Sequence, residues 1–167
     1  MITRRNFLKA GAAVAALSVV PNGFASILAK KEKAIGVQLY SVRDDLKTDF
    51  DGTMKALVDI GYKRMEAAGY RDGKFYGKSP AEMKKYLADL GARMVGSHTG
   101  SGLLAEGDTK GWDFWKKNAA DTAEVGCKWI VQAGYPSKDI KSLSDVKRLA
   151  DQFNKCGEIA KANGLRF

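Results

Sequence analysis

The segment Ala34–Ser41 alternates apolar residues with polar or small ones. The apolar positions are Ile35, Val37 and Leu39, and the positions between them are Gly36, Gln38 and Tyr40. A period of two is typical of a β-strand, so we predict a strand here. After a charged stretch, apolar residues recur at helical spacing from Phe50, and Asp49 before them is a residue type that caps helices. The pattern therefore predicts a strand followed by a helix.

The same plan recurs along the rest of the chain. The second helix has the clearest signals, because Ser79 is a capping residue, Pro80 suits the first turn and Glu82 completes a capping box. Beyond the first strand and helix, we expect strands at 63–67, 93–97 and 128–132, the start of a fifth at 165–167, and helices at 80–90, 112–125 and onward from Ser142 or Ser144, the last with an apolar face of Val146, Leu149, Phe153, Cys156 and Ala160.

Each predicted helix ends at a glycine that is followed closely by a strand. These glycines are Gly61, Gly91, Gly126 and Gly164, spaced 30, 35 and 38 positions apart. A repeat of this length is one strand–helix unit, and strands joined by helices run parallel with right-handed crossovers. The fold class is therefore α/β, either a doubly wound sheet or an eightfold barrel. The first strand–helix loop lacks a glycine-rich phosphate motif, which weakens the dinucleotide-binding form of the doubly wound sheet.

The N-terminal segment reads as an export signal. Thr3–Lys9 (TRRNFLK) is a twin-arginine pattern, Ala10–Val20 is apolar, and Gly23–Ala25 offers small residues for cleavage. We predict a signal peptide at 1–25, a linker at 26–34 and a periplasmic or otherwise exported protein. The apolar run is shorter than the ~20 residues of a membrane span, so no stable membrane span is expected. The export machinery is thus one expected partner.

The charge distribution and the cysteine spacing argue against nucleic-acid binding and against a cysteine metal site. The net charge is +9, of which three charges belong to the leader, and the lysines elsewhere are scattered along predicted helices. This distribution argues against a nucleic-acid partner. Cys127 and Cys156 fit no metal-binding spacing, and we interpret both as buried, unpaired thiols, although export would permit a disulfide.

Three segments resemble a known family. Gly36–Arg43 (GVQLYSVR), Gly61–Ala67 (GYKRMEA) and Gly96–Gly100 (GSHTG) are similar to the xylose isomerase-like barrel superfamily, and more narrowly to exported sugar phosphate isomerase/epimerase proteins. The resemblance implies a TIM barrel with a divalent metal (Mn, Mg, Zn or Co) at its mouth, held by Glu, Asp, His and Glu from the later strands. It also implies isomerisation or epimerisation of a small-molecule carbohydrate through movement of a proton next to a carbonyl.

The chain is shorter than a complete barrel of this kind. A complete barrel takes ~250 residues, and about four and a half of eight strand–helix units fit into 35–167. We therefore expect an incomplete TIM barrel, the N-terminal part of a longer protein, without the family's metal ligands. We expect this chain alone to be inactive, to bind no divalent metal and to self-associate through its open strand edges.

Two titratable residues are the catalytic candidates. Glu66 falls at the end of the second predicted strand, and a carboxylate there could act as a base, orient a sugar hydroxyl or simply pair with a neighbouring strand. His98, which is the only histidine, follows the third predicted strand and could contact the substrate or shuttle a proton. One histidine cannot build a metal site, so no metal ligands are assigned.

Several polar and aromatic residues are candidates for sugar binding or for packing. Trp112 and Trp115 could stack on a sugar, but a contact between helix and barrel is the preferred interpretation. The glycines of Gly100–Gly102 lack the lysine and spacing of a phosphate loop. The substrate-binding candidates at the ends of the first and fourth strands are Gln38, Tyr40, Ser41, Gln132 and Tyr135.

Four functions remain in competition. A carbohydrate isomerase or epimerase is the leading hypothesis, and a sugar lyase or dehydratase (inosose dehydratase-like) would share its proton-abstraction step. The third is a non-catalytic half-barrel binding module. A DNA-repair endonuclease is disfavoured by the export leader and the unclustered charge.

Overall fold

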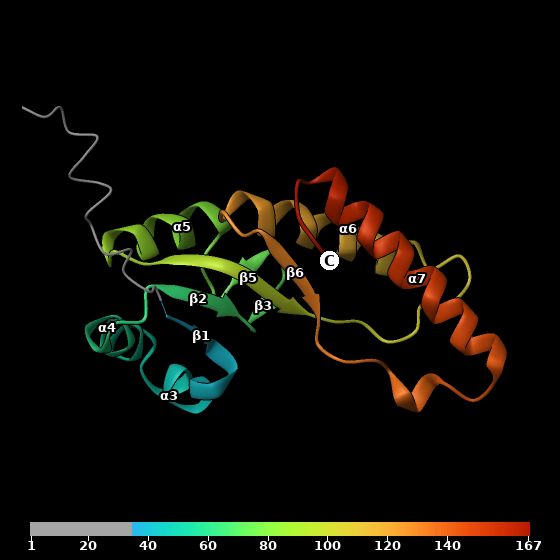
Figure 1. Cartoon of the computed structure of the whole chain (residues 1–167), viewed down its shortest axis with the longest axis horizontal. Coiled ribbons are helices and arrows are strands. Elements are labelled where there is room, and N and C mark those ends of the chain that lie inside the picture. Colours follow the sequence, from blue (N-terminus) through green and yellow to red (C-terminus); the bar gives the residue numbers. More distant parts are fainter. Residues whose placement is uncertain (1–34) are drawn as a thin grey trace, which may run out of the picture. The chain divides into compact units, whose positions relative to one another are not determined.

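The computed structural model describes residues 35–167, and the predicted signal peptide and linker lie outside this range. Helices separate the strands of the main sheet along the described part of the chain (Figure 1). In chain order the elements are β1 (Gly36–Gln38), the 3₁₀ helix η1 (Leu39–Val42), α3 (Arg43–Thr48), α4 (Phe50–Ile60), β2 (Arg64–Ala67), β3 (Tyr70–Arg71), β4 (Lys74–Phe75), α5 (Pro80–Asp89), β5 (Arg93–Thr99), α6 (Thr109–Glu124), β6 (Trp129–Gln132), the 3₁₀ helix η2 (Ser137–Asp139) and α7 (Leu143–Ala162).

The main sheet has four parallel strands in the order β1-β2-β5-β6. A parallel bridge between Trp129 and Arg166 continues the series beyond β6, at the place of the expected fifth strand. Each new strand joins the same edge of the sheet, and the order never reverses. A doubly wound sheet reverses its strand order at a switch point, whereas a barrel adds strands in sequence. The observed order therefore selects the barrel arrangement.

The helix ends follow the predicted capping chemistry. The Asp49 carboxylate accepts a hydrogen bond from the Gly52 amide at the start of α4, and Gly61 ends that helix with φ of 114°, a conformation that favours glycine. Ser79 and Glu82 form the predicted capping box of α5. Ser142, rather than Ser144, caps α7. Local sequence thus fixes where these helices begin.

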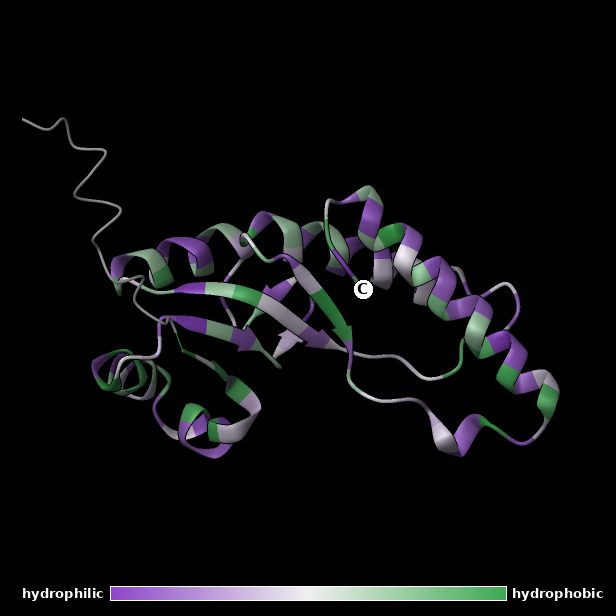
Figure 2. Ribbon diagram, in the orientation of Figure 1, coloured by the Kyte–Doolittle hydropathy of each residue, from purple (hydrophilic) through white to green (hydrophobic). Residues whose placement is uncertain are grey.

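The two faces of the sheet differ in coverage. Met65, Met94 and Ile130 are at most 1% exposed and belong to the main apolar core, with α5 packing on β5 and α6 on β6 (Figure 1). On the other face Trp129, in register with Gly96, is 44% exposed. In Figure 2 single strands of the sheet accordingly carry both hydrophobic and hydrophilic residues.

Several predicted boundaries were wrong. The first strand ends at Gln38, because the chain turns into a 3₁₀ helix that carries Tyr40 and Ser41, and α3 precedes the predicted first helix. The third strand extends to Thr99 and so contains His98 instead of preceding it. Helix α6 begins at Thr109, because Asp108 caps it. In α7, Val146 is 49% exposed and does not belong to the buried face.

The sequence analysis also missed a short hairpin between β2 and α5. Strands β3 and β4 pair antiparallel in a separate two-stranded sheet, with Tyr70 opposite Phe75. Asp72 and Gly73 turn the chain with φ of 53° and 74°. An Asp-Gly pair with positive φ at both residues is a typical hairpin turn. This dipeptide was the signal that could have predicted the hairpin.

Candidate functional site

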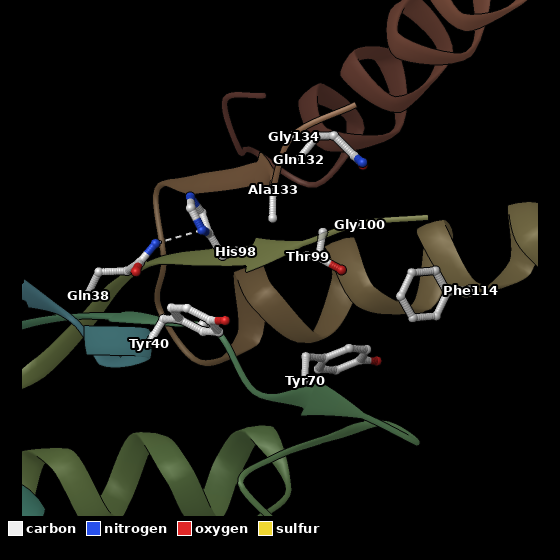
Figure 3. Close-up of a pocket in the computed structure, with 11 residues that line it drawn as sticks. Gln38, Tyr40, Tyr70, His98, Thr99, Gly100, Phe114, Gln132, Ala133 and Gly134 are labelled. Atoms are coloured by element: carbon white, nitrogen blue, oxygen red, sulfur yellow. Dashed lines mark hydrogen bonds between the residues drawn. The ribbon is translucent and has the colours of Figure 1, made fainter. Parts of the chain in front are cut away.

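A cavity of about 630 Å³ opens at the carboxyl ends of the parallel strands (Figure 3). This is the end of a βα barrel at which active sites form. Each parallel strand or the segment after it contributes to the lining, and one residue of α6 closes a side. The lining residues are Gln38, Tyr40, Ala68, Tyr70, His98, Thr99, Gly100, Phe114, Gln132, Ala133 and Gly134.

His98 lies between two polar side chains from neighbouring strands. The amide Nε2 of Gln38 is 2.7 Å from His98 Nδ1, and the Glu66 carboxylate Oε1 is 3.4 Å from His98 Nε2. The side chains of His98 and Glu66 are 26% and 31% exposed. A carboxylate at this place stabilises a positive charge on the imidazole whenever the ring is protonated. His98 and Glu66 can therefore exchange a proton at the cavity, while Gln38 orients the imidazole.

One wall of the cavity is aromatic and is anchored to helix α6. The Tyr70 hydroxyl donates a hydrogen bond of 2.7 Å to Asp121 Oδ2, and Lys117 pairs with the other oxygen of the same carboxylate. Burial, and then the hydrogen bond to Asp121, raise the pKa of Tyr70 well above its usual range. The phenol therefore stays protonated. The Phe114 ring lies 6.1 Å from that of Tyr70 and extends the wall.

The loop after β5 is held in place by amide side chains. Gln132 donates from Nε2 to the Ser101 carbonyl over 3.3 Å, while its buried Oε1 has no hydrogen-bond partner within 35–167. Gln152 of α7, which is 4% exposed, accepts from the Leu104 amide and donates to the Gly102 carbonyl. These hydrogen bonds hold in place the loop that follows Gly100, which lines the cavity.

The structure brings together four of the seven residues predicted from sequence. Gln38, Tyr40, His98 and Gln132 all line the cavity. Glu66 does not line the cavity, but its carboxylate contacts His98, which does. The two remaining candidates, Ser41 and Tyr135, do not line it: Ser41 is exposed on η1, and Tyr135 is 65% exposed in the loop after β6. The catalytic and binding roles of all seven stay predictions.

Sequence reasoning missed Tyr70 and Phe114. Tyr70 belongs to the unpredicted hairpin, whereas Phe114 lies within the predicted helix 112–125, where the sequence does not mark which side faces the cavity. The preferred interpretation of Trp115 is confirmed, because this side chain is 1% exposed in the helix packing and donates from Nε1 to Ser101 Oγ over 3.0 Å. The Lys155 ammonium lies over the Trp112 ring, 4.0 Å from the ring centroid.

Both cysteines are free and buried, as predicted. Within 35–167 no group of three or more His, Cys, Asp or Glu side chains could hold a metal ion. Glu66 and His98 at the cavity therefore do not fit a metal centre by themselves. Among the same residues no helix is long and apolar enough to cross a membrane.

Comparison with known proteins supports the export signal and the fold. The model of the twin-arginine translocation pathway signal sequence matches residues 1–21, inside the predicted signal peptide, and indicates that the protein is exported. None of the curated proteins compared matches the chain.

Several of the similar structures are described as sugar isomerases or epimerases. A sugar phosphate isomerase/epimerase from Parabacteroides distasonis ATCC 8503 matches with a TM-score of 0.68 at 32% identity, over 87% of this chain and 54% of that one. Another structure under the same name and from the same organism gives 0.65 at 29% identity, over 78% and 51%. A D-psicose 3-epimerase, solved in the presence of D-fructose, gives 0.54 at 18% identity, over 70% and 45%, which supports the fold alone.

These matches define the class of the fold. The chain is structurally similar to xylose isomerase-like TIM barrels, so the predicted barrel is confirmed. It spans about half the length of the solved structures it matches. The four strands of the main sheet, β1, β2, β5 and β6, correspond to parallel strands of such a barrel.

Proposed function

We propose that the protein is an exported carbohydrate isomerase or epimerase whose sugar binds at the cavity around His98. The observation that carries the proposal is the position of His98, at the carboxyl end of a parallel strand, between Gln38 and the Glu66 carboxylate. The resemblance to sugar phosphate isomerase/epimerase structures supports the same class of reaction. Because the chain spans about half of those proteins, the activity is proposed for the whole barrel.

Isomerisation and epimerisation of a sugar require proton transfer at a carbon and at the neighbouring carbonyl oxygen. A base removes the proton from a carbon next to the carbonyl, and the carbonyl oxygen gains a proton or a hydrogen bond as negative charge develops on it. Return of the proton to the opposite face of that carbon gives an epimer, whereas its return to the neighbouring carbon gives an isomer. We assign His98 to proton transfer at the sugar and Glu66 to orienting the imidazole and stabilising its charged form.

The cavity lining suits an uncharged polyol. The rings of Tyr40, Tyr70 and Phe114 offer apolar surface to the C–H face of a sugar, and the amides of Gln38 and Gln132 offer groups that can pair with hydroxyls. The lining within 35–167 contains no lysine or arginine. An unphosphorylated sugar suits the aromatic and amide groups described here, and a sugar phosphate is the alternative to be tested beside it.

A divalent metal is expected for the family, but the described residues do not form its site. When bound, such an ion would polarise the carbonyl and stabilise the developing negative charge. The steps assigned to His98 and Glu66 concern only contacts that this chain makes itself.

The proposal is tested by hydrogen exchange into sugars. The exported protein, purified as its native host makes it, is incubated in D₂O with ketoses, aldoses, cyclitols and ketose phosphates, with magnesium, manganese, cobalt or zinc in separate samples. Mass spectrometry then measures deuterium at carbon. We expect one deuterium at the carbon next to the carbonyl of at least one sugar, together with its isomer or epimer. His98→Asn should lower this exchange at least tenfold, whereas Asn154→Ala, at an exposed asparagine of α7, should leave it unchanged.

Other outcomes point to the competing functions. Exchange accompanied by loss of water would identify a dehydratase and overturn the isomerase proposal. Sugar binding without exchange under any of these metals would leave only a binding module. Unchanged exchange in His98→Asn would remove that residue from the reaction.

A further inference from the structure

The two ring nitrogens of His98 face chemically different groups. Nδ1 lies 2.7 Å from the amide nitrogen of Gln38, and Nε2 lies 3.4 Å from a carboxylate oxygen of Glu66. Figure 3 shows the Gln38 amide directed at the imidazole, with the hydrogen bond drawn as a dashed line. The imidazole therefore has a hydrogen-bond donor, the Gln38 amide nitrogen, beside Nδ1 and an acceptor, the Glu66 carboxylate, near Nε2.

This arrangement follows from strand register. Gln38 of β1 is paired with Glu66 of β2, and Glu66 is paired in turn with Gly96 of β5. His98 stands two residues beyond Gly96, and alternate residues of a strand point to the same face. The three side chains thus meet on one face, across three neighbouring strands, and the backbone hydrogen bonds of the sheet hold their spacing.

The hydrogen positions on a neutral ring follow from what each neighbour can do. An amide nitrogen only donates, so it needs a bare lone pair on Nδ1. An ionised carboxylate only accepts, so it favours a hydrogen on Nε2. With the Gln38 amide in its present orientation, the opposite tautomer would set the Nδ1 hydrogen against the Gln38 amide hydrogens and the Nε2 lone pair against the Glu66 carboxylate. Both contacts of that tautomer would be repulsive.

We propose that Gln38 is a positioning residue that, together with Glu66, holds neutral His98 in the tautomer with its hydrogen on Nε2. This inference rests on the proposed function for its consequence, which is that His98 meets the sugar as a hydrogen-bond donor. The 3.4 Å separation from Glu66 is longer than the ~2.9 Å of a good N–H···O bond, so the hydrogen on Nε2 can be shared with a sugar oxygen. The Nδ1 lone pair, occupied by Gln38, is withdrawn from base chemistry.

The sequence makes this proposal directly measurable, because His98 is the only histidine in the chain. Long-range ¹H–¹⁵N correlation spectra of the ¹⁵N-histidine-labelled full chain report which ring nitrogen carries the hydrogen, without any assignment step. The spectra are recorded near pH 8.5, about two units above the ordinary imidazole pKa, where an unperturbed ring is neutral. We expect a single tautomer, with the hydrogen on Nε2.

Variants separate the role of Gln38 from general packing. Gln38→Met keeps the length of the side chain but removes the donor, so the ring should relax to a mixture of both tautomers. Gln38→Glu places an acceptor beside Nδ1 and should draw a hydrogen onto that nitrogen. Gln132→Met changes another amide of the same cavity, one that is hydrogen-bonded to Ser101 and not to His98, and should leave the imidazole spectrum unchanged.

Two results would overturn the proposal. One is a wild-type ring with its hydrogen on Nδ1, a measurement that needs no variant to fold. The other is a folded Gln38→Met protein with the wild-type imidazole spectrum. Neither experiment contains sugar, so a failed tautomer prediction leaves the exchange assay standing, and an inactive protein with the predicted tautomer overturns only the proposed function.

Discussion

Asn118 of helix α6 donates a hydrogen bond of 2.6 Å from Nδ2 to Oγ1 of Thr99, the last residue of β5. Both side chains are buried, and the Asn118 Oδ1 accepts in turn from Thr122 of the same helix over 3.1 Å. Thr99 lines the cavity one residue after His98. This buried polar chain therefore ties the strand end that carries His98 to the helix behind it.

Removing Asn118 should be costly. Asn118→Ala leaves the buried hydroxyl of Thr99 without its donor, and we expect a loss of about 2 kcal/mol or more in the free energy of unfolding. Urea denaturation measures this loss as a lower midpoint with an unchanged slope. Asn154→Ala, an exposed asparagine of α7, is the matched control and should stay within about 0.5 kcal/mol of wild type. Equal midpoints for the two variants would contradict the structural role of Asn118.

The capping box of α5 predicts a pH dependence of stability. Hydrogen bonds from the Ser79 backbone amide, and then from its hydroxyl, lower the pKa of Glu82 below its ordinary value of 4.5. A carboxyl whose pKa is depressed by folding stabilises the protein above its unfolded pKa, and this contribution disappears as the pH falls through the folded pKa. Glu82→Gln should therefore be less stable than wild type near pH 7, and the gap should close as the pH falls below about 4.

Thermal unfolding as a function of pH measures this gap. The control is Glu158→Gln, at an exposed glutamate near the end of α7 and away from the helix cap. Its difference from wild type should not vary with pH in the same window. A Glu82→Gln gap that stays constant down to acid pH would argue against the capping carboxylate as its source.

The two thiols should be unreactive in the folded protein. Cys127 and Cys156 are 3% and 1% exposed, and burial raises the pKa of each thiol to about 12. Because the thiolate is the reactive form, a thiol-modifying disulfide reagent should label neither residue at about pH 8. Unfolding in guanidinium should expose both to stoichiometric labelling. Rapid labelling without denaturant, or a mass change on reduction that reveals a disulfide, would contradict the buried free thiols.

The part of the fold that sequence predicted rests on local chemistry. Asp49, Ser79 and Ser142 cap helices through groups only a few residues away, and Gly61 ends α4 through its own backbone conformation. Such interactions leave a signature in consecutive residues. Alternation and helical spacing also predicted the parallel strands and most helices, because each element must turn one face to the core.

The site depends on relationships that consecutive residues do not contain. Gln38 and His98 are 60 positions apart and meet only because three strands align. A shift of register between Met65 and Glu66 pairs Glu66 with Gly96 instead of Val95, and a bulge of this kind redirects the side chains that follow it. The sequence could therefore suggest Glu66 and His98 one by one, but not that they are in contact.

The leader offers a test of export. Arg4→Lys combined with Arg5→Lys keeps the charge of the segment but removes the pair that defines a twin-arginine signal. We expect the uncleaved precursor to stay inside the cell, whereas the wild type is exported and begins near Ser26. Immunoblotting of cell fractions and N-terminal sequencing measure both. Arg71→Lys with Arg93→Lys, exposed in the folded part, should be exported normally. Unchanged export of the leader variant would refute the twin-arginine assignment.

Tyr70 should hold the unpredicted hairpin against α6. Its hydroxyl donates to Asp121, which is 3% exposed, and the only other side chain bonded to that carboxylate within 35–167 is Lys117. Tyr70→Phe keeps the aromatic wall of the cavity but takes one donor from a buried charged acceptor, so we expect a loss of about 1 kcal/mol in the free energy of unfolding. Because the hairpin carries exposed Arg71 and Lys74, loosening it should also speed tryptic cleavage after these residues. Mass spectrometry of timed digests measures the rate, and Tyr135→Phe, at an exposed tyrosine, should digest like the wild type. Cleavage at wild-type rates in a folded Tyr70→Phe protein would show that the ring, and not its hydrogen bond to Asp121, holds the hairpin.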